Sequence, residues 1–316
     1  MYAQPGFSGG RKTRPVPERW CFLGARLKPW AVKLRPLLIA PLIALTGLGS
    51  PAVRADQAEL PRGIAPSQPI ERFRFHAGAP LSASAGIGAD GSICIGTADG
   101  YVHLLGPDGG FRWSRSVIGA ITRRPVQSGE LWFVTTSAER IYALTAQGTL
   151  YWVFRPPSPV ASELAVDATG VTYFVAADRF FYGVTAHGGV SLRAAFGELK
   201  AGPVPAPDGA VWAENQAGNL VRVRGQELRR MPREPTQGVD FGSLDGLRDP
   251  DGHEWHVRAD GVVEFTPALG SPPALVHLTS SALLSPRWSS TAHYVVICAR
   301  DGLVVALAAP RDPAIR

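Results

Sequence analysis

The densest group of side chains that could bind a metal ion lies in the segment RDPDGHEWH, residues 248–256. Carboxylates and imidazoles are common ligands of divalent metals, and the candidate ligands are Asp249, Asp251, Glu254 and His256. On a strand, Glu254 and His256 would share one face and His253 would point the other way. The same residues also form an Asp-Pro-Asp-Gly turn sequence, and turn chemistry alone explains both Asp residues. We therefore consider a metal site and a purely structural turn as alternatives.

A second chemical feature is a run of arginines within LVRVRGQELRRM, residues 220–231. Its candidate partner-binding residues are Arg222, Arg224, Arg229 and Arg230. Arg222 and Arg224 would lie on one face of a strand, because side chains alternate along strands. Such a face could bind an acidic protein or a glycan carboxylate. The alternative is a solvated outer strand whose charge is balanced by acidic neighbours such as Glu227.

Other catalytic patterns are missing from the sequence. After residue 55 there is no Gly-x-Ser-x-Gly elbow and no recognised phosphate-binding glycine loop. Cys94 and Cys298 lie inside apolar runs, so they could be buried free thiols or, in an exported protein, oxidised cysteines. We expect a protein that is not an enzyme and that carries no cofactor.

The first 55 residues differ from the rest and are typical of a secretory signal with an over-long N-terminal extension. Basic residues precede the apolar run LLIAPLIALTGL, residues 37–48, which is too short to span a membrane. Val53 and Ala55 occupy the small-residue positions of a cleavage site. Cleavage near Ala55 predicts a soluble periplasmic or secreted protein without a transmembrane span.

Removal of this segment changes the charge of the protein. Residues 1–55 contain nine Lys and Arg residues and one Glu, so 23 basic and 25 acidic residues remain. The mature chain would therefore be slightly acidic, and we expect no nucleic-acid partner.

Six copies of one pattern follow, after an expected linker at residues 56–69. The copies are aligned at turn residues spaced by 40, 39, 40, 42 and 41 positions, namely Gly100, Arg140, Arg179, Asn219, Gly261 and Gly302. Each copy predicts a loose first strand, such as PLSASAG, and then two strands joined by a tight turn. Asp-Gly turns between β-branched and aromatic runs are hairpin signals. Four strands repeated about every 40 residues predict a six-bladed β-propeller over residues 70–309, followed by a tail at residues 310–316.

The outer strands of this propeller can also be predicted. Copies one to five offer a fourth strand at residues 111–115, 150–155, 190–195, 227–231 and 274–278. The sixth copy has little chain left, but ERFRFHA, residues 71–77, resembles a fourth strand without its own blade. Pairing of this N-terminal strand with the last blade would close the ring and remove an open edge.

Aromatic residues recur in the second strand of several copies, namely Phe133, Tyr173, Trp212 and Trp255. They could form a stacking platform for a ligand or pack between blades. In the alignment above, Phe133 and Trp212 lie one residue out of step with the other two. This offset argues against a shared platform and favours packing between blades.

The copies resemble the repeat of the PQQ-like, or quinoprotein-type, propellers. The resemblance is carried by ICIGTADGYVHLLGPDGGFRW, ERIYALTAQGTLYWVF and DRFFYGVTAHGGVSL, including the Gly-x-x-x-Trp spacing of Gly109–Trp113 and Gly148–Trp152. The family includes quinone-dependent dehydrogenases and a non-enzymatic periplasmic branch with the assembly lipoprotein of the outer-membrane Bam machine. This chain is more similar to the second branch, although it has six copies and no lipidation cysteine.

This resemblance implies a protein-binding or scaffold propeller of the bacterial cell envelope, with an envelope protein as its partner. PQQ is not expected as a cofactor. The alternative is a propeller enzyme or a cofactor- or metal-binding protein with a site in its central funnel. The sequence leaves the oligomeric state open.

Overall fold

The computed structural model describes residues 68–206, 208–231, 246–268 and 272–310. The expected signal peptide at residues 1–55 lies outside these residues, as do most of the expected linker and tail. Every regular element in the described part of the chain is a β-strand. None of the described elements is a helix with the length and apolarity that crossing a membrane requires.

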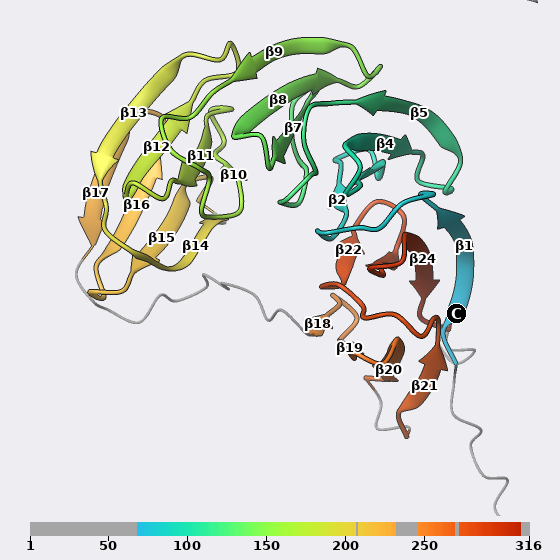
Figure 1. Cartoon of the computed structure of the whole chain (residues 1–316). Coiled ribbons are helices and arrows are strands. Elements are labelled where there is room, and N and C mark those ends of the chain that lie inside the picture. The colour runs from blue at the N-terminus through green and yellow to red at the C-terminus, as the bar shows by residue number, and fades with distance from the viewer. Residues whose placement is uncertain (1–67, 207, 232–245, 269–271, 311–316) are drawn as a thin grey trace, which may run out of the picture. The chain divides into compact units, whose positions relative to one another are not determined.

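The strands form six antiparallel sheets of four strands each, which are the blades of a six-bladed β-propeller (Figure 1). The first blade contains β2 (Gly86–Ile87), β3 (Ile93–Gly96), β4 (Tyr101–Leu105) and β5 (Phe111–Ser116). The second contains β6 (Val126–Ser128), β7 (Leu131–Thr136), β8 (Arg140–Thr145) and β9 (Leu150–Phe154). The third contains β10 (Ala165–Val166), β11 (Thr172–Val175), β12 (Phe180–Val184) and β13 (Val190–Ala195).

The remaining blades follow the same order along the chain. The fourth contains β14 (Leu199–Pro205), β15 (Val211–Asn215), β16 (Leu220–Arg224) and β17 (Glu227–Met231). The fifth contains β18 (Gly246–Arg248), β19 (Glu254–Val257), β20 (Val262–Thr266) and β21 (Ala274–His277). The sixth contains β22 (Arg287–Ser289), β23 (Tyr294–Cys298), β24 (Leu303–Ala308) and the N-terminal β1 (Ile70–His76).

The N-terminal strand completes the last blade, as the sequence predicts. In Figure 1 the blue β1 lies beside the dark red β24, and the two strands pair from Ile70 with Ala308 to His76 with Leu303. An irregularity in the pairing lies between Glu71 and Phe73. This ladder joins the two ends of the repeat array, so the edge of β24 is not left open.

The first strands are shorter than predicted. The segment PLSASAG was expected to be a strand, but only its last residue, Gly86, belongs to β2. Leu81 forms an isolated bridge with Thr97, and bends at residues 82 and 83 take the intervening chain out of the ladder. These first strands contact one another in the order β22, β2, β6, β10 and β14, so they form the inner wall of the propeller.

The alignment of the copies needs a correction of one residue in two blades. The turn between the second and third strands requires a positive φ, which Gly100 adopts in the first blade. In the second and fourth blades the corresponding residues are Glu139 and Gly218, with φ of 56° and 78°. The sequence alignment used the residues that follow these, Arg140 and Asn219.

With this correction the four aromatic residues fall into step, so the predicted offset was wrong. Phe133, Tyr173 and Trp255 are fully buried in clusters that join neighbouring blades. Trp212 is partly buried at the equivalent position of β15. The interpretation as packing between blades therefore holds for the three buried rings.

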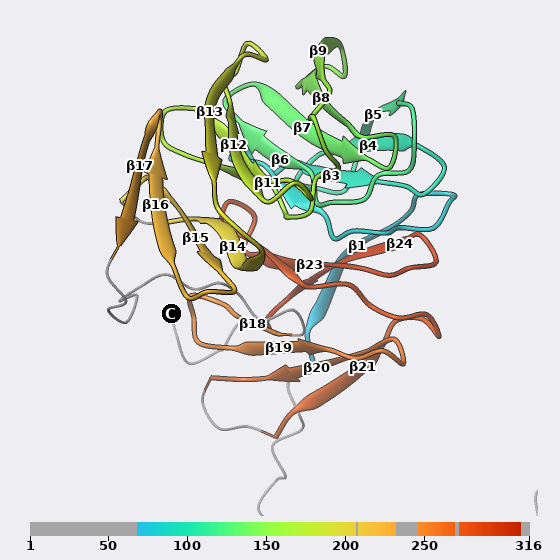
Figure 2. The same ribbon diagram turned by 60° about the vertical axis from the view of Figure 1, so that its left-hand side comes forward.

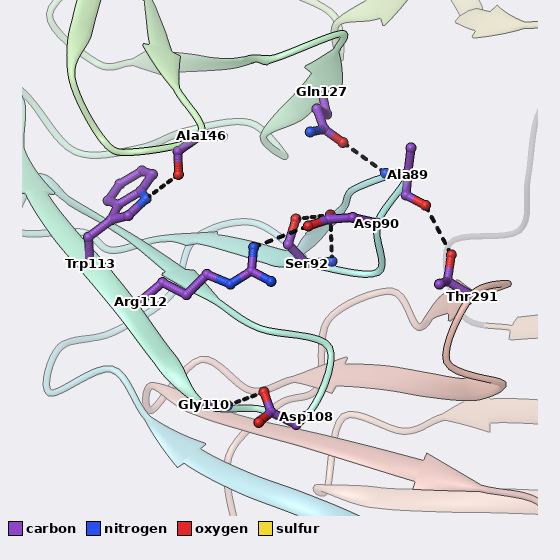
Figure 3. A network of polar contacts seen from close by, with 10 residues as sticks. All are labelled: Ala89, Asp90, Ser92, Asp108, Gly110, Arg112, Trp113, Gln127, Ala146 and Thr291. Atoms are coloured by element: carbon purple, nitrogen blue, oxygen red, sulfur yellow. Dashed lines mark hydrogen bonds and ion pairs between the residues drawn. The ribbon is translucent and has the colours of Figure 1, made fainter.

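The Gly-x-x-x-Trp spacing has a packing reason. The Trp113 indole lies over Gly148 of the next blade, where an added Cβ would come within 2.7 Å of the ring. Its Nε1 donates to the Ala146 carbonyl at 2.8 Å (Figure 3). Trp152 repeats this arrangement over Gly188 of the third blade. Each glycine therefore receives the aromatic ring of the preceding blade.

Polar contacts also fasten the blades to each other (Figure 3). The loop at Ala89 accepts a hydrogen bond from Thr291 of the sixth blade and donates one to Gln127 of the second. Within the first blade, Asp90 pairs with Arg112 at 3.1 Å. The loop between β2 and β3 is therefore held from both neighbouring blades.

Cys94 and Cys298 are buried free thiols, in agreement with the first of the two alternatives for these residues. Cys94 packs between the first and second blades, and Cys298 between the sixth and first. Burial strongly raises the pKa of the Cys94 thiol, and burial also raises the pKa of the Cys298 thiol to about 12. Both are thus neutral packing residues at ordinary pH.

Candidate functional site

Asp249 is the central residue of the turn that carries the predicted metal ligands. The residue is 4% exposed, and its Oδ1 accepts backbone N–H bonds from Asp251 at 3.1 Å and His253 at 2.9 Å. Its Oδ2 accepts the Trp255 indole N–H at 3.0 Å. Asp249 therefore closes the turn before β19 and fixes the aromatic ring of that strand.

The third blade uses the same device without any metal-ligand pattern. The Oδ1 of Asp167 accepts the backbone N–H groups of Thr169 and Val171, and its Oδ2 accepts the Tyr173 hydroxyl at 2.8 Å. The spacings of two, four and six residues match those of Asp249. Burial alone would raise the pKa of Asp167, but hydrogen bonds, chiefly from the Gly225 N–H, outweigh it and lower that pKa.

The predicted ligands are not all brought together. One ligand atom each of Asp249, Asp251 and His253 lies within 4.8 Å of the others. Glu254 and His256 are exposed on β19, with 4.0 Å between His256 Nε2 and Glu254 Oε2. His253, which the alternation placed on the opposite face, thus replaces them beside the aspartates. Its Nδ1 accepts the Ala268 N–H at 3.0 Å, so only its Nε2 could bind a metal.

The arginine run lies on β16 and β17, which form the outer half of the fourth blade. Across these strands Arg222 is paired with Arg229, and Arg224 with Glu227. Acidic groups balance both: Arg222 bonds to Asp208 at 2.7 Å, and Arg229 bonds to Glu227. Arg224 and Arg230 are exposed. Much of the positive charge of this face is therefore neutralised within the blade.

The outer strand of the second blade is a feature that the sequence reasoning did not single out. β9, with the sequence LYWVF, is paired only with β8 and ends its sheet (Figure 2). Its Leu150, Tyr151 and Val153 side chains are 40%, 53% and 42% exposed. The alternate residues face the third blade: Trp152 Nε1 donates to the Ala186 carbonyl at 2.7 Å. The strand is thus firmly seated while its outer side stays apolar and open.

Charge distinguishes β9 from most other outer strands. β1, β5, β13 and β17 each contain one or more charged residues, whereas β9 and the shorter β21 contain no Asp, Glu, Lys or Arg. Charged residues on an edge strand hinder the addition of a further strand. The missing charge in LYWVF was the signal in the sequence that could have identified this edge.

A cleft of about 840 Å³ lies between the second and third blades and reaches β9 at Tyr151. Tyr151 lines it together with residues of both blades, including Glu130, Thr169 and His187. An extended segment lying along β9 could place a side chain in this recess. The edge and the cleft together form one candidate binding surface.

Comparison with known proteins supports the resemblance of the repeats. Residues 80–233 match a family model described as outer membrane protein assembly factor BamB, PQQ_2. The repeats within residues 80–233 are therefore similar to those of the PQQ-like repeat family. A curated member, the outer membrane protein assembly factor BamB of Burkholderia pseudomallei (strain K96243), is 37% identical over 92 residues. That match covers 28% of this chain and only 24% of the relative.

Solved structures support the architecture of this PQQ-like propeller. The WD40 β-propeller domain of Doa1 matches it with a TM-score of 0.55 and 12% sequence identity. The match covers 78% of this chain and 98% of the Doa1 domain. At this identity the similarity concerns the propeller fold alone.

Proposed function

We propose that this chain is an exported, non-enzymatic propeller of the bacterial cell envelope that binds a protein partner through β9. The observation that carries the proposal is an uncharged outer strand with three exposed apolar side chains. An unpaired strand edge can accept an extended segment as an additional strand, with backbone hydrogen bonds for affinity and side-chain recesses for specificity. The cleft lined by Tyr151 offers such a recess.

The rigidity of β9 supports this function. Trp152 is fixed by its bond to Ala186, and Phe154 packs against Phe174 with ring centroids 6.4 Å apart. The edge is therefore held in a strand conformation before any partner arrives. A preorganised edge loses little conformational entropy on binding, which favours affinity.

The partner that fits is a strand segment of an outer-membrane β-barrel protein. Such strands alternate apolar and polar residues, so one face can cover Tyr151 and Val153 while the other faces water. The partner's class agrees with the description of the matching family model, an outer membrane protein assembly factor. An envelope location accords with the predicted signal peptide.

Peptide binding tests the proposal directly. A fluorescent ten-residue peptide of alternating apolar and polar residues would be titrated with the purified protein, and its anisotropy measured. A second peptide would carry the same side chains but N-methyl groups on alternate backbone nitrogens. Loss of two backbone hydrogen bonds predicts roughly tenfold weaker binding of the methylated peptide.

Protein variants locate the binding edge. Tyr151→Lys combined with Val153→Lys places two charges on β9 and should abolish binding of the unmodified peptide. Val190→Lys on β13 is the matched control, because Val190 is 53% exposed on the next outer strand. Equal peptide affinities of the β9 variant and the wild type would contradict the proposed binding site.

A further inference from the structure

Two arginines lie on the inner wall in the blades on either side of the first blade, Arg124 just before β6 and Arg287 in β22. In the first three blades, the first strand begins to pair with the second strand at Gly86, Val126 and Ala165. The residues two positions before these are Ser84, Arg124 and Glu163. Arg287 of the sixth blade occupies the pairing position itself, where the first blade has Gly86. The first blade thus contributes only small side chains between two arginines.

The small residues of the first blade allow the flanking blades to approach. A Cβ added to Gly86 would lie 2.2 Å from the Pro125 carbonyl oxygen, next to Arg124. The first strand β2 contacts both β6 and β22. The side chains of Arg124 and Arg287 therefore flank a wall segment with the sequence SASAG, residues 82–86, which offers them no charge.

Few acidic groups balance this cluster. The backbone N–H of Arg124 donates to Glu163 Oε2 at 3.1 Å, but no described carboxylate lies within 4.0 Å of the Arg124 or Arg287 guanidinium. Arg123 precedes Arg124 in the chain. Its Nη2 donates to the Ala161 carbonyl at 3.2 Å, while its buried Nε has no hydrogen-bond partner among the described residues.

The electrostatics of the cluster agree with a shortage of negative charge. The pKa of Arg287 is lowered to about 10, chiefly by burial and also by the positive charge of Arg124, while Glu163 opposes the shift. Burial also lowers the pKa of Arg124, and again Glu163 opposes the shift. Arg124, Arg287 and Glu163 together leave an excess of one positive charge.

We propose that this part of the inner wall is a binding site for a phosphate group, with Arg124 and Arg287 as its principal ligands. A guanidinium donates two parallel hydrogen bonds to a pair of oxygens. Two guanidiniums on either side of a narrow wall need a ligand with more than one oxygen edge, which a phosphate has and a single carboxylate lacks. The negative charge of the phosphate would also offset the excess of positive charge.

Calorimetric titration of the purified protein with inorganic phosphate, at constant ionic strength in chloride, tests this site. Wild type should bind one phosphate saturably. Arg124→Gln and Arg287→Gln should each weaken binding about tenfold or more, because each removes charge-assisted hydrogen bonds. Arg258→Gln is the matched control: Arg258 is exposed and paired with Asp260 in the fifth blade. Its phosphate affinity should equal that of the wild type.

A variant that should strengthen phosphate binding keeps the test independent of folding defects. Glu163→Gln removes the nearest negative charge and should strengthen phosphate binding about fivefold. Glycerol phosphate distinguishes the source of the ligand: binding with the same arginine dependence assigns the site to phosphate esters, and binding of inorganic phosphate alone assigns it to the free ion. Lack of saturable phosphate binding, or equal affinity of wild type, Arg124→Gln and Arg287→Gln, would overturn the proposal.

Discussion

The glycine that receives the Trp113 ring provides a sharp test of how neighbouring blades dock. We consider Gly148→Ala. Gly148 has a φ of +79°, and an added Cβ would meet Trp113 at 2.7 Å. Gly78 has nearly the same φ, +81°, but an added Cβ would meet nothing within 4 Å. Gly78→Ala therefore measures the cost of the backbone conformation alone.

The magnitude follows from these two contributions. An alanine at positive φ costs about 1–2 kcal/mol, and this cost is common to both variants. Overpacking against the indole adds about 1–3 kcal/mol in Gly148→Ala only. Gly148→Ala should therefore be less stable than Gly78→Ala by about 1–3 kcal/mol. In a Trp113→Ala background the ring is gone, and this extra cost should disappear.

Urea unfolding followed by tryptophan fluorescence and circular dichroism measures these differences. Coincident transitions by the two methods allow free energies of unfolding to be compared. If Gly148→Ala and Gly78→Ala lose the same stability, the ring of the preceding blade does not dock on the glycine. Persistence of the extra cost in the Trp113→Ala background would refute the reasoning equally.

Three further predictions concern single side chains. Asp249→Ala should lower the free energy of unfolding by about 2–3 kcal/mol, because it removes three hydrogen bonds from a buried turn. Asp251→Ala should change that free energy by less than about 0.5 kcal/mol. Urea titration compares the two variants, and equal losses of stability would contradict the turn interpretation. Phe73→Ala should cost about 2 kcal/mol because partly buried Phe73 closes the ring, whereas Phe111→Ala, at a 57% exposed position, should cost clearly less in the same assay. The pKa of Asp167 is lowered in the folded protein, so the ionised carboxylate stabilises the fold fully above about pH 4, and this stabilisation is lost as the pH falls through the folded pKa. The stability difference between wild type and Asp167→Asn should therefore shrink from about pH 6 to about pH 3. A constant difference would exclude stabilisation by the ionised carboxylate.

Much of the fold could be predicted because each copy carries its own local signals. The turn sequences and apolar runs locate the second, third and fourth strands, and the predicted strand at residues 190–195 coincides with β13. The first strands were harder to predict, since β2 and β10 contain only two residues. Their positions depend on contacts with neighbouring blades, which a local pattern does not contain.

The candidate sites were predicted less well, for the same physical reason. Asp249 stood out by composition, but the recurrence of its hydrogen bonds at Asp167 became visible only in the structure. In the second blade, the one-residue misalignment arose where Glu139 takes a conformation typical of glycine. Arg124 and Arg287 are 163 positions apart in the sequence. Only closure of the ring brings their blades to either side of the first blade.

Hydrogen exchange at β9 tests the central claim most directly. Backbone amide exchange of the whole chain would be measured with and without a saturating amount of the alternating peptide. Strand addition predicts that exchange slows mainly within Leu150–Phe154, with a smaller effect at the cleft residues beside it. Unchanged exchange of β9, with slowing confined to another outer strand such as β13, would contradict the account.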